Sequence, residues 1–213
     1  MIIGNPSPWR ARFNQLEKKF SERIKKIWPD CSVLVHSDSQ ENRITNILVH
    51  SLQKDKIARK LGLIVPQYTL LEEEQIGDVV TKGIIDFAVF IHKDHERYIA
   101  FECKRLNVSF TSGKKSLALD YVNEGMMRYI SAQYAKNLPL GVMLGYVMDG
   151  DLDKAHENIK NSIRKKNTEL QCLDESSFEE MIATDNHLYF VSEHMVGSSR
   201  FSIKHSLLPI IRC

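Results

Sequence analysis

The sequence has few of the features that mark membrane, secreted or zinc-binding proteins. No stretch of the 213 residues approaches the roughly 18 apolar residues of a membrane-spanning helix, so no membrane partner is expected. The four cysteines are scattered, with no Cys-x-x-Cys pair, which excludes the common zinc-ligand spacings. The formal net charge is only +2, so any nucleic-acid binding needs a local basic patch.

Two catalytic motifs and a targeting segment are also missing. The phosphate loop Gly-x-x-x-x-Gly-Lys-[Ser/Thr] does not occur, so nucleotide hydrolysis by that route is not expected. The Gly-x-Ser-x-Gly elbow of α/β-hydrolases is absent as well. The first six residues show no basic segment followed by a hydrophobic stretch, so we expect no signal peptide and a cytoplasmic protein with reduced cysteines.

The sequence does contain two apolar segments, within 84–106, that are predicted to be strands joined by a charged turn at 92–96. Asp86 interrupts the first strand, and Glu102 and Lys104 interrupt the second. Strands bury such residues only when something compensates their charge. For two carboxylates beside a lysine, the usual compensation is a divalent metal ion.

The expected geometry follows from strand alternation. Side chains two residues apart share a face, so Glu102 and Lys104 point the same way. If the turn is symmetric about Asp94, antiparallel pairing sets Asp86 opposite Glu102, with Cβ atoms about 4.5–5.5 Å apart. Carboxylates that close repel each other unless they are protonated or bridged. The alternative is a structural ion pair at a strand edge, with Asp86 merely ending a sheet.

Asp86, followed after fifteen residues by Glu102-Cys103-Lys104, resembles the motif of the PD-(D/E)xK, or restriction-endonuclease-like, nuclease superfamily. The order of predicted elements over about residues 35–150 is similar to that core as well. Ile85 stands where the proline that names the motif would be, a frequent departure in the superfamily. The resemblance implies an α/β fold with a three-layer core, in which helices flank a mixed central sheet of about five strands.

The resemblance also implies roles for individual residues. Asp86 and Glu102 would bind Mg²⁺ directly, for which Mn²⁺ can substitute, and the carbonyl of Cys103 would be a further ligand. Lys104 would orient or deprotonate the attacking water, and Glu41 would hold a metal-bound water or a second ion. The implied reaction is hydrolysis of phosphodiester bonds in DNA, with RNA left open as a substrate, in a bacterial restriction, repair or phage-defence system.

Two further questions stay open at this stage. Cutting both strands of a duplex would favour a homodimer, because one such site cuts one strand at a time; a partner protein that supplies targeting is the other option. The alternative to an enzyme is a non-catalytic scaffold or nucleic-acid-binding module of the same fold in a larger complex. A bare Glu-x-Lys is also a weak signal, since Glu17-Lys18-Lys19 fits it too, on a predicted amphipathic helix where it forms no site.

Helical periodicity predicts an N-terminal amphipathic helix within residues 1–30 that ends at Pro29 and packs as an extension on a nuclease-like domain of residues 31–213. A second helix is predicted to begin with a capping box of Asp38 and Glu41 and to run to about Leu61. Because Glu41 continues the apolar stripe of this helix, two roles remain open for it: helix cap and metal-site residue.

A third helix is predicted over 117–136, with Tyr121, Gly125 and Arg128 on one stripe. Gly125 indicates close packing against the sheet or a ligand. Arg128 needs a carboxylate or a phosphate as partner, and the sequence leaves both open. The loop over 107–115 is polar and expected to be exposed. The candidate nucleic-acid contacts are Lys114, Lys115, Arg128 and Tyr121.

The remaining segments complete the expected sheet. A loop and short strand are predicted at 64–73, a central strand buried on both faces at 140–148, a helix that begins after Asp151, and two strands at 187–192 and 200–204. His156 is expected at the surface or its boundary. Three residues of the last part are expected to border the substrate groove: His194, Lys204 and His205.

Overall fold

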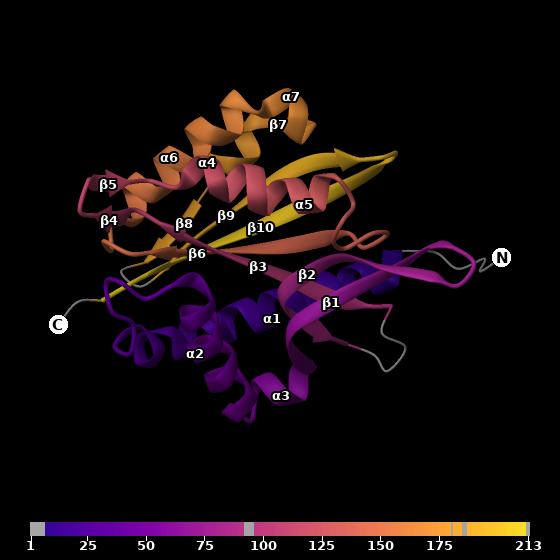
Figure 1. The fold of residues 1–213 in the computed structure, drawn as a ribbon, viewed down its shortest axis with the longest axis horizontal. Coiled ribbons are helices and arrows are strands. Elements are labelled where there is room, and N and C mark those ends of the chain that lie inside the picture. The colour runs from indigo at the N-terminus through magenta and orange to yellow at the C-terminus, as the bar shows by residue number, and fades with distance from the viewer. Residues whose placement is uncertain (1–6, 92–95, 180, 185–186, 212–213) are drawn as a thin grey trace.

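The computed structural model describes residues 7–91, 96–179, 181–184 and 187–211. It is an α/β fold in which one mixed sheet lies between two layers of helices (Figure 1). The N-terminal half contains α1 (Ser7–Ser32), α2 (Glu41–Lys54), α3 (Ala58–Leu61), β1 (Leu63–Gln75), β2 (Asp78–Phe90), β3 (Tyr98–Leu106), β4 (Val108–Phe110) and β5 (Gly113–Lys115). The C-terminal half contains α4 (Ala118–Asp120), a π-helix (Tyr121–Met126), α5 (Met127–Ile130), β6 (Leu140–Val147), α6 (Leu152–Lys165), α7 (Asn167–Leu170), β7 (Cys172–Asp174), a 3₁₀ turn (Glu175–Phe178), β8 (Met181–Thr184), β9 (His187–Val196) and β10 (Ser199–Pro209).

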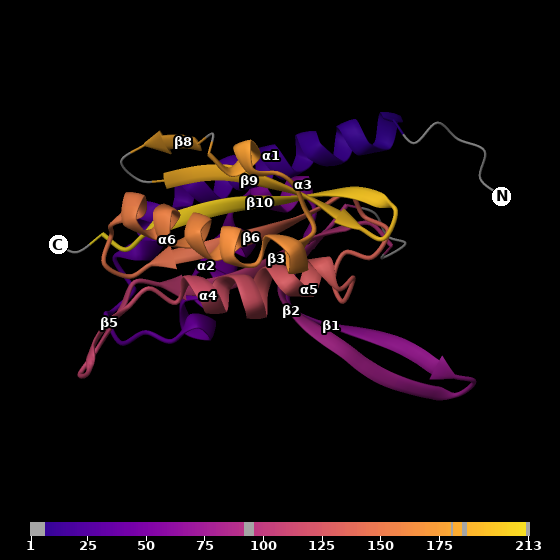
Figure 2. The ribbon, with the colours of Figure 1, turned by 90° about the horizontal axis from the view of Figure 1, so that it is seen from above.

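Over the described residues the sheet has eight strands, in the order β1-β2-β3-β6-β10-β9-β7 with β8 also paired to β9. The expectation of about five strands was therefore wrong, because antiparallel strands extend both edges of the sheet. The centre is parallel, since β6 pairs in parallel with both β3 and β10. Helices α1 to α3 lie on one face, and α4 to α7 lie on the other (Figures 1 and 2). Among the described residues, no helix is long and apolar enough to cross a membrane.

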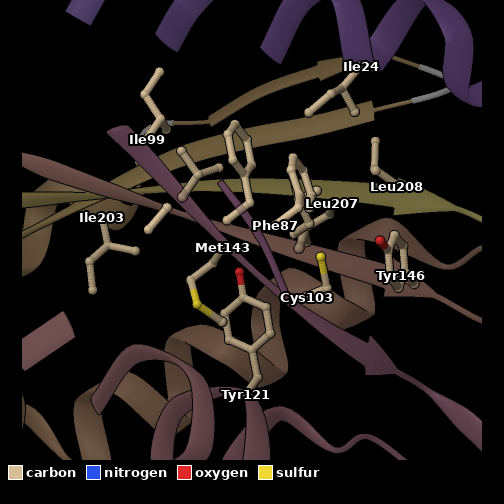
Figure 3. Packing of buried hydrophobic residues seen from close by; sticks show 14 of the residues in the cluster. Ile24, Phe87, Ile99, Cys103, Tyr121, Met143, Tyr146, Ile203, Leu207 and Leu208 are labelled. Atoms are coloured by element: carbon tan, nitrogen blue, oxygen red, sulfur yellow. The ribbon is translucent and has the colours of Figure 1, made fainter. Parts of the chain in front are cut away.

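Strand β6 runs through the middle of the core. All eight of its residues are buried, which confirms the prediction of a central strand covered on both faces. Figure 3 shows side chains from both helical layers meeting the sheet here: Ile24 of α1 lies near Leu207 and Leu208, while Tyr121 of the π-helix lies beside Met143 on the other side. The apolar run thus marks the place where the two layers bury most of their apolar surface.

Helix α1 continues past Pro29 to Ser32, so the prediction that proline ends this helix was wrong. A proline near the end of a helix removes only one backbone hydrogen bond. The last turn of α1 remains helical because Cys31 and Ser32 are buried there. The apolar stripe of α1 belongs to the core. Trp28 is fully buried, donates from Nε1 to the carbonyl of Pro209 at 2.7 Å, and stacks on Tyr146.

The predicted second helix is interrupted between α2 and α3 at Asp55, where the backbone leaves the helical conformation. The Asp55 carboxylate accepts from the N–H groups of Ile57 and Ala58 and binds Arg23 of α1, whose Nε lies 2.7 Å from Oδ1. The expected capping box was wrong, because Gln40 precedes α2 and makes no side-chain cap hydrogen bond. One carboxylate therefore breaks the long helix and ties its second part to α1.

Asp55→Asn is expected to lower the free energy of unfolding at pH 7 by about 1–2 kcal/mol. The Arg23 guanidinium lowers the pKa of Asp55 from its ordinary 3.8 to about 2. A carboxyl whose pKa is lower in the folded than in the unfolded chain stabilises the folded state at pH values above its ordinary pKa. This contribution is lost as the pH falls through about 2. Urea unfolding at pH 7 and at pH 2–3 measures this. A difference that stays constant with pH would contradict the ion pair, and exposed Asp38→Asn is the control.

Strands β1 and β2 form a hairpin that is much longer than the loop and short strand predicted at 64–73. Each strand has 13 residues, but β2 pairs with β3 only from Phe87 to Phe90. The distal half of the hairpin leaves the sheet as an arm (Figure 2). The segment 107–115, expected to be an exposed loop, contains the two-stranded hairpin of β4 and β5, which is exposed from residue 109 onward, whereas Asn107 and Val108 are buried. The predicted turn centred on Asp94 lies outside the described residues.

Candidate active site

The motif residues meet where β2 and β3 separate. The observed pairs run from Phe90 with Tyr98 to Phe87 with Phe101, which is the register that the symmetric turn predicted. Asp86 and Glu102 are the next residues in line, immediately beyond the last pair. Beyond this point β3 has a free edge on the side of β2, so its backbone N–H groups need other partners.

Two carboxylates supply those partners. Asp86 Oδ2 accepts from the backbone N–H of Cys103 at 2.7 Å, and Glu41 Oε2 accepts from the backbone N–H of Arg105 at 3.1 Å. Asp86 comes from the departing strand β2 and Glu41 from the first turn of α2. The divergence of the strands is therefore what draws acidic side chains from distant parts of the chain toward Glu102 and Lys104.

Glu102 is fully buried and lies between two cations. Its Oε1 accepts from Arg128 Nη1 at 2.8 Å and lies 3.0 Å from Lys104 Nζ. Its Oε2 is buried with no hydrogen-bond partner among the described residues. A buried carboxylate oxygen without a donor costs about 1–3 kcal/mol or more, so this atom is a position at which an added cation or donor would be favourable.

Lys104 joins Glu102 to Glu41. Its Nζ lies 3.1 Å from Glu41 Oε1, and only 12% of its side chain is exposed. Glu41 thus uses both oxygens, one for Lys104 and one for the edge of β3. The expected cap role of Glu41 was wrong, and its neighbours are a lysine and a backbone N–H rather than the two other carboxylates.

Arg128 reaches the site from α5, directly after the π-helix. Its partner is the site carboxylate Glu102, one of the two kinds of partner that the sequence left open. Tyr134 accepts a second hydrogen bond from Arg128 Nη1 at 2.8 Å and in turn donates to the carbonyl of Ile84 on β2. Gly125 packs against Met143 of β6 so closely that no Cβ would fit without movement, as the glycine predicted.

Burial and mutual repulsion shift the ionisation of the site. Burial, with the nearby charge of Asp86, raises the pKa of Glu102 to about 7, while Lys104 and Arg128 act in the opposite direction. Burial also raises the pKa of Asp86, against the hydrogen bond from Cys103. Burial opposes the charge of Lys104, but the surrounding carboxylates, Glu102 first, raise its pKa above the ordinary value. The cluster contains three carboxyl groups, of Glu41, Asp86 and Glu102, and two basic groups, of Lys104 and Arg128. It therefore has one more acidic than basic group.

Only two carboxylates of the cluster, Asp86 and Glu102, are placed to bind one divalent ion together. Within the described residues, no three His, Cys, Asp or Glu side chains gather into a metal-binding group, so the expected trio with Glu41 is not formed. Asp86 and Glu102 remain side by side, and the unpartnered Oε2 of Glu102 suits the one or two carboxylates that Mg²⁺ typically takes from a protein. The thiol of Cys103 is fully buried toward Tyr146 and Thr45 and cannot contribute.

Two of the four candidate nucleic-acid contacts lie on an exposed element. Lys114 and Lys115 are exposed on β5, whereas Arg128 is one-third exposed and bound to Glu102. Tyr121 was a wrong choice: it is fully buried, and its hydroxyl lies 3.0 Å from His205 Nδ1. Sequence reasoning missed Tyr134, because it follows the end of α5 and no spacing links it to Arg128.

Tyr121→Phe is expected to lower the free energy of unfolding by about 1–3 kcal/mol and to leave DNA affinity unchanged. The substitution removes the partner of a buried imidazole nitrogen without changing the exposed surface. Chemical denaturation measures the first effect, and a DNA-binding titration measures the second. A clear loss of DNA affinity at full stability would instead restore the contact role of this tyrosine.

The histidines of the last strands do not border the candidate site. His194 and His205 are fully buried and share a hydrogen-bonded chain through Ser192, and burial lowers the pKa of both. His156 is buried as well, with its ring tilted against that of Phe190, which corrects its expected position at the surface or its boundary. Neutral imidazoles pack here as core groups, since each finds polar partners inside. Lys204 lies on the face covered by α1.

Comparisons of the chain with protein-family models, with curated proteins and with solved structures found no match. The geometry of the site and the motif therefore carry the functional interpretation.

Proposed function

We propose that the chain is a metal-dependent nuclease of the PD-(D/E)xK type that hydrolyses phosphodiester bonds in DNA. One observation carries the proposal: Asp86 and Glu102 follow the last pair of β2 and β3 where the two strands part, one buried oxygen of Glu102 has no donor in the described part of the chain, and Lys104 is within hydrogen-bond distance of the same carboxylate. A π-helix packs directly over these residues, and such helices occur frequently at functional sites.

In this proposal Asp86 and Glu102 would hold Mg²⁺, or Mn²⁺ in its place, and the carbonyl of Cys103 would be a further ligand. The ion would position the scissile phosphate, acidify water and stabilise the charge that develops on oxygen. Lys104 would orient the attacking water and stabilise the charge that develops on the phosphate, and its hydrogen bond to Glu41 keeps the ammonium in place. Arg128 restrains Glu102 and offers its exposed face to phosphate, while Lys114 and Lys115 contact the backbone from β5.

A second candidate is a non-catalytic nucleic-acid-binding module or scaffold with the same fold. The observation that favours it is the internal pairing of the cluster, in which Lys104 and Arg128 neutralise most of the acidic charge and no group of three ligands forms among the described residues. Such a network can serve stability alone. The two candidates differ in whether DNA is cut.

Incubating the chain with supercoiled and with linear DNA, in Mg²⁺, Mn²⁺ or EDTA, tests the proposal. We expect nicking of the supercoiled form with either metal ion and none in EDTA. Lys104→Ala is expected to lose cleavage, because no other ammonium reaches the site in the described structure. DNA binding without cleavage under every metal condition would favour the scaffold. The same assay on RNA decides the substrate, and the mass of the chain in solution tests a homodimer.

A further inference from the structure

A second hollow lies on the face of the sheet opposite Glu102. It is a cavity of about 480 Å³ between α1 and the strands β8, β9 and β10. Pockets that hold small organic ligands typically measure about 300–1,000 Å³. The candidate active site lies against α5 and the π-helix, whereas this cavity lies against α1. Helices α5 and α1 cover opposite faces of the sheet (Figure 1).

Three lysines line this cavity, and two of them, Lys18 and Lys204, attract the buried carboxylate of Glu17 beside them. Lys18 and Lys25 come from α1, and Lys204 comes from β10, between β6 and β9. Among the described residues, none of the three forms an ion pair. Lys204 is the most unusual, since it is half-buried in an interior strand and, although the charge of Glu17 acts on it, it forms no close ion pair within the described residues. Three unpaired ammonium groups around one cavity suit an anionic ligand.

The cavity also offers acceptors and an aromatic surface. Glu17 is 2% exposed, and its Oε1 accepts from Ser21 Oγ at 2.7 Å. Glu22 lies at the exposed rim, so the lining holds three basic and two acidic groups. Tyr189 and His187 of β9, stacked 6.4 Å apart, line the side formed by the sheet. A ligand that combines negative charge, N–H donors and a flat ring meets all of these features.

We propose that this cavity binds a nucleoside monophosphate. The phosphate contacts Lys18, Lys25 and Lys204, the N–H groups of the base donate to Glu17, and the base lies against Tyr189. The volume suits one mononucleotide rather than a strand, so the cavity is a small-molecule site and not an extension of a DNA-binding surface. The proposal does not depend on nuclease activity, because it uses none of the residues around Glu102.

Isothermal titration of the full chain in EDTA, with 5′-AMP, 5′-GMP, 5′-CMP and 5′-UMP, tests this site. At least one nucleotide is expected to bind one per chain with a Kd at or below about 1 mM, and at least about tenfold more tightly than inorganic phosphate or the matching nucleoside. Lys18→Ala is expected to weaken this binding about tenfold, as is Lys204→Met. Lys19→Ala, at the adjacent position but outside the cavity lining, is the matched control and should bind as the unaltered chain does.

Several outcomes would overturn the proposal. If inorganic phosphate binds as tightly as any nucleotide, the cavity is a simple anion site and the nucleotide proposal is wrong. The proposal is also wrong if no nucleotide binds at concentrations on the order of 10 mM. Equal losses for Lys18→Ala and Lys19→Ala would indicate unspecific attraction. Lys104→Ala should bind the nucleotide unchanged, because a loss there would place the ligand in the candidate active site instead. Since Lys18 is exposed, its variant keeps the test valid even if Lys204→Met does not fold.

Discussion

Asp86→Asn and Glu102→Gln are each expected to lower the rate of Mg²⁺-dependent DNA cleavage by about a thousandfold or more. A bound metal ion contributes several kcal/mol of transition-state stabilisation, and about 1.4 kcal/mol corresponds to a factor of ten in rate. Each substitution removes one of the two adjacent carboxylates while keeping the size of the side chain. DNA affinity should stay the same or rise, because a carboxylate that repels phosphate is lost.

The measurement is nicking of supercoiled DNA under single-turnover conditions, beside a DNA-binding titration. Glu124→Gln is the matched control, since Glu124 is exposed on the π-helix next to the site and forms no ion pair with any residue that the structure describes. Circular dichroism verifies folding of each variant. Full metal-dependent nicking by either carboxylate variant would reject the proposed metal site, and equal loss in Glu124→Gln would show that the effect is unspecific.

Trp28→Ala is expected to lower the free energy of unfolding by about 3–5 kcal/mol, the largest stability effect among the substitutions considered. The indole is fully buried, its ring stacks on Tyr146 at 5.4 Å, and its Nε1 hydrogen-bonds the carbonyl of Pro209 in the last strand. Truncation leaves a cavity and an unpaired carbonyl inside the core. For a chain of this length, such a loss lowers Tm by about 10 °C.

Trp9 is the natural control, because it is the other tryptophan on the same helix and is only partly buried against Phe13 and Arg97. Trp9→Ala is expected to cost about 1 kcal/mol or less. Thermal unfolding followed by circular dichroism compares the two variants. A loss for Trp28→Ala no greater than that for Trp9→Ala would contradict the packing of α1 as part of the core.

The sequence reveals part of the candidate site because that part depends on local geometry. The alternation of strand side chains placed Glu102 and Lys104 on one face, and the equal distances of Asp86 and Glu102 from Asp94 along the sequence predicted the register observed for β2 and β3. Gly125 predicted close packing for a similar reason, since a glycine within a helix often lies where a neighbouring group leaves no space for a Cβ atom. Neither inference needs knowledge of the distant chain.

The roles that were predicted wrongly all depend on partners far along the sequence. Glu41 was expected to form a capping box with Asp38, but its carboxylate contacts the edge of β3 and Lys104, which is 63 residues away. Tyr121 was expected to face DNA, yet it packs against His205 in the interior. A polar side chain on an amphipathic element can point to solvent or to a buried partner, and periodicity alone does not distinguish the two.

The amino-acid sequence by itself determined the α/β class, the central strand β6, and the acidic and basic residues that meet at the separation of β2 and β3, because strand and helix periods are local properties of the chain. Only the tertiary structure decided the breadth of the sheet, the oxygen of Glu102 that has no donor among the described residues, and the meeting of three lysines around the cavity between α1 and the sheet. Those features depend on which groups, distant in the sequence, lie close together in the low-dielectric interior. Packing, and not spacing along the chain, decides which of these groups find hydrogen-bond partners.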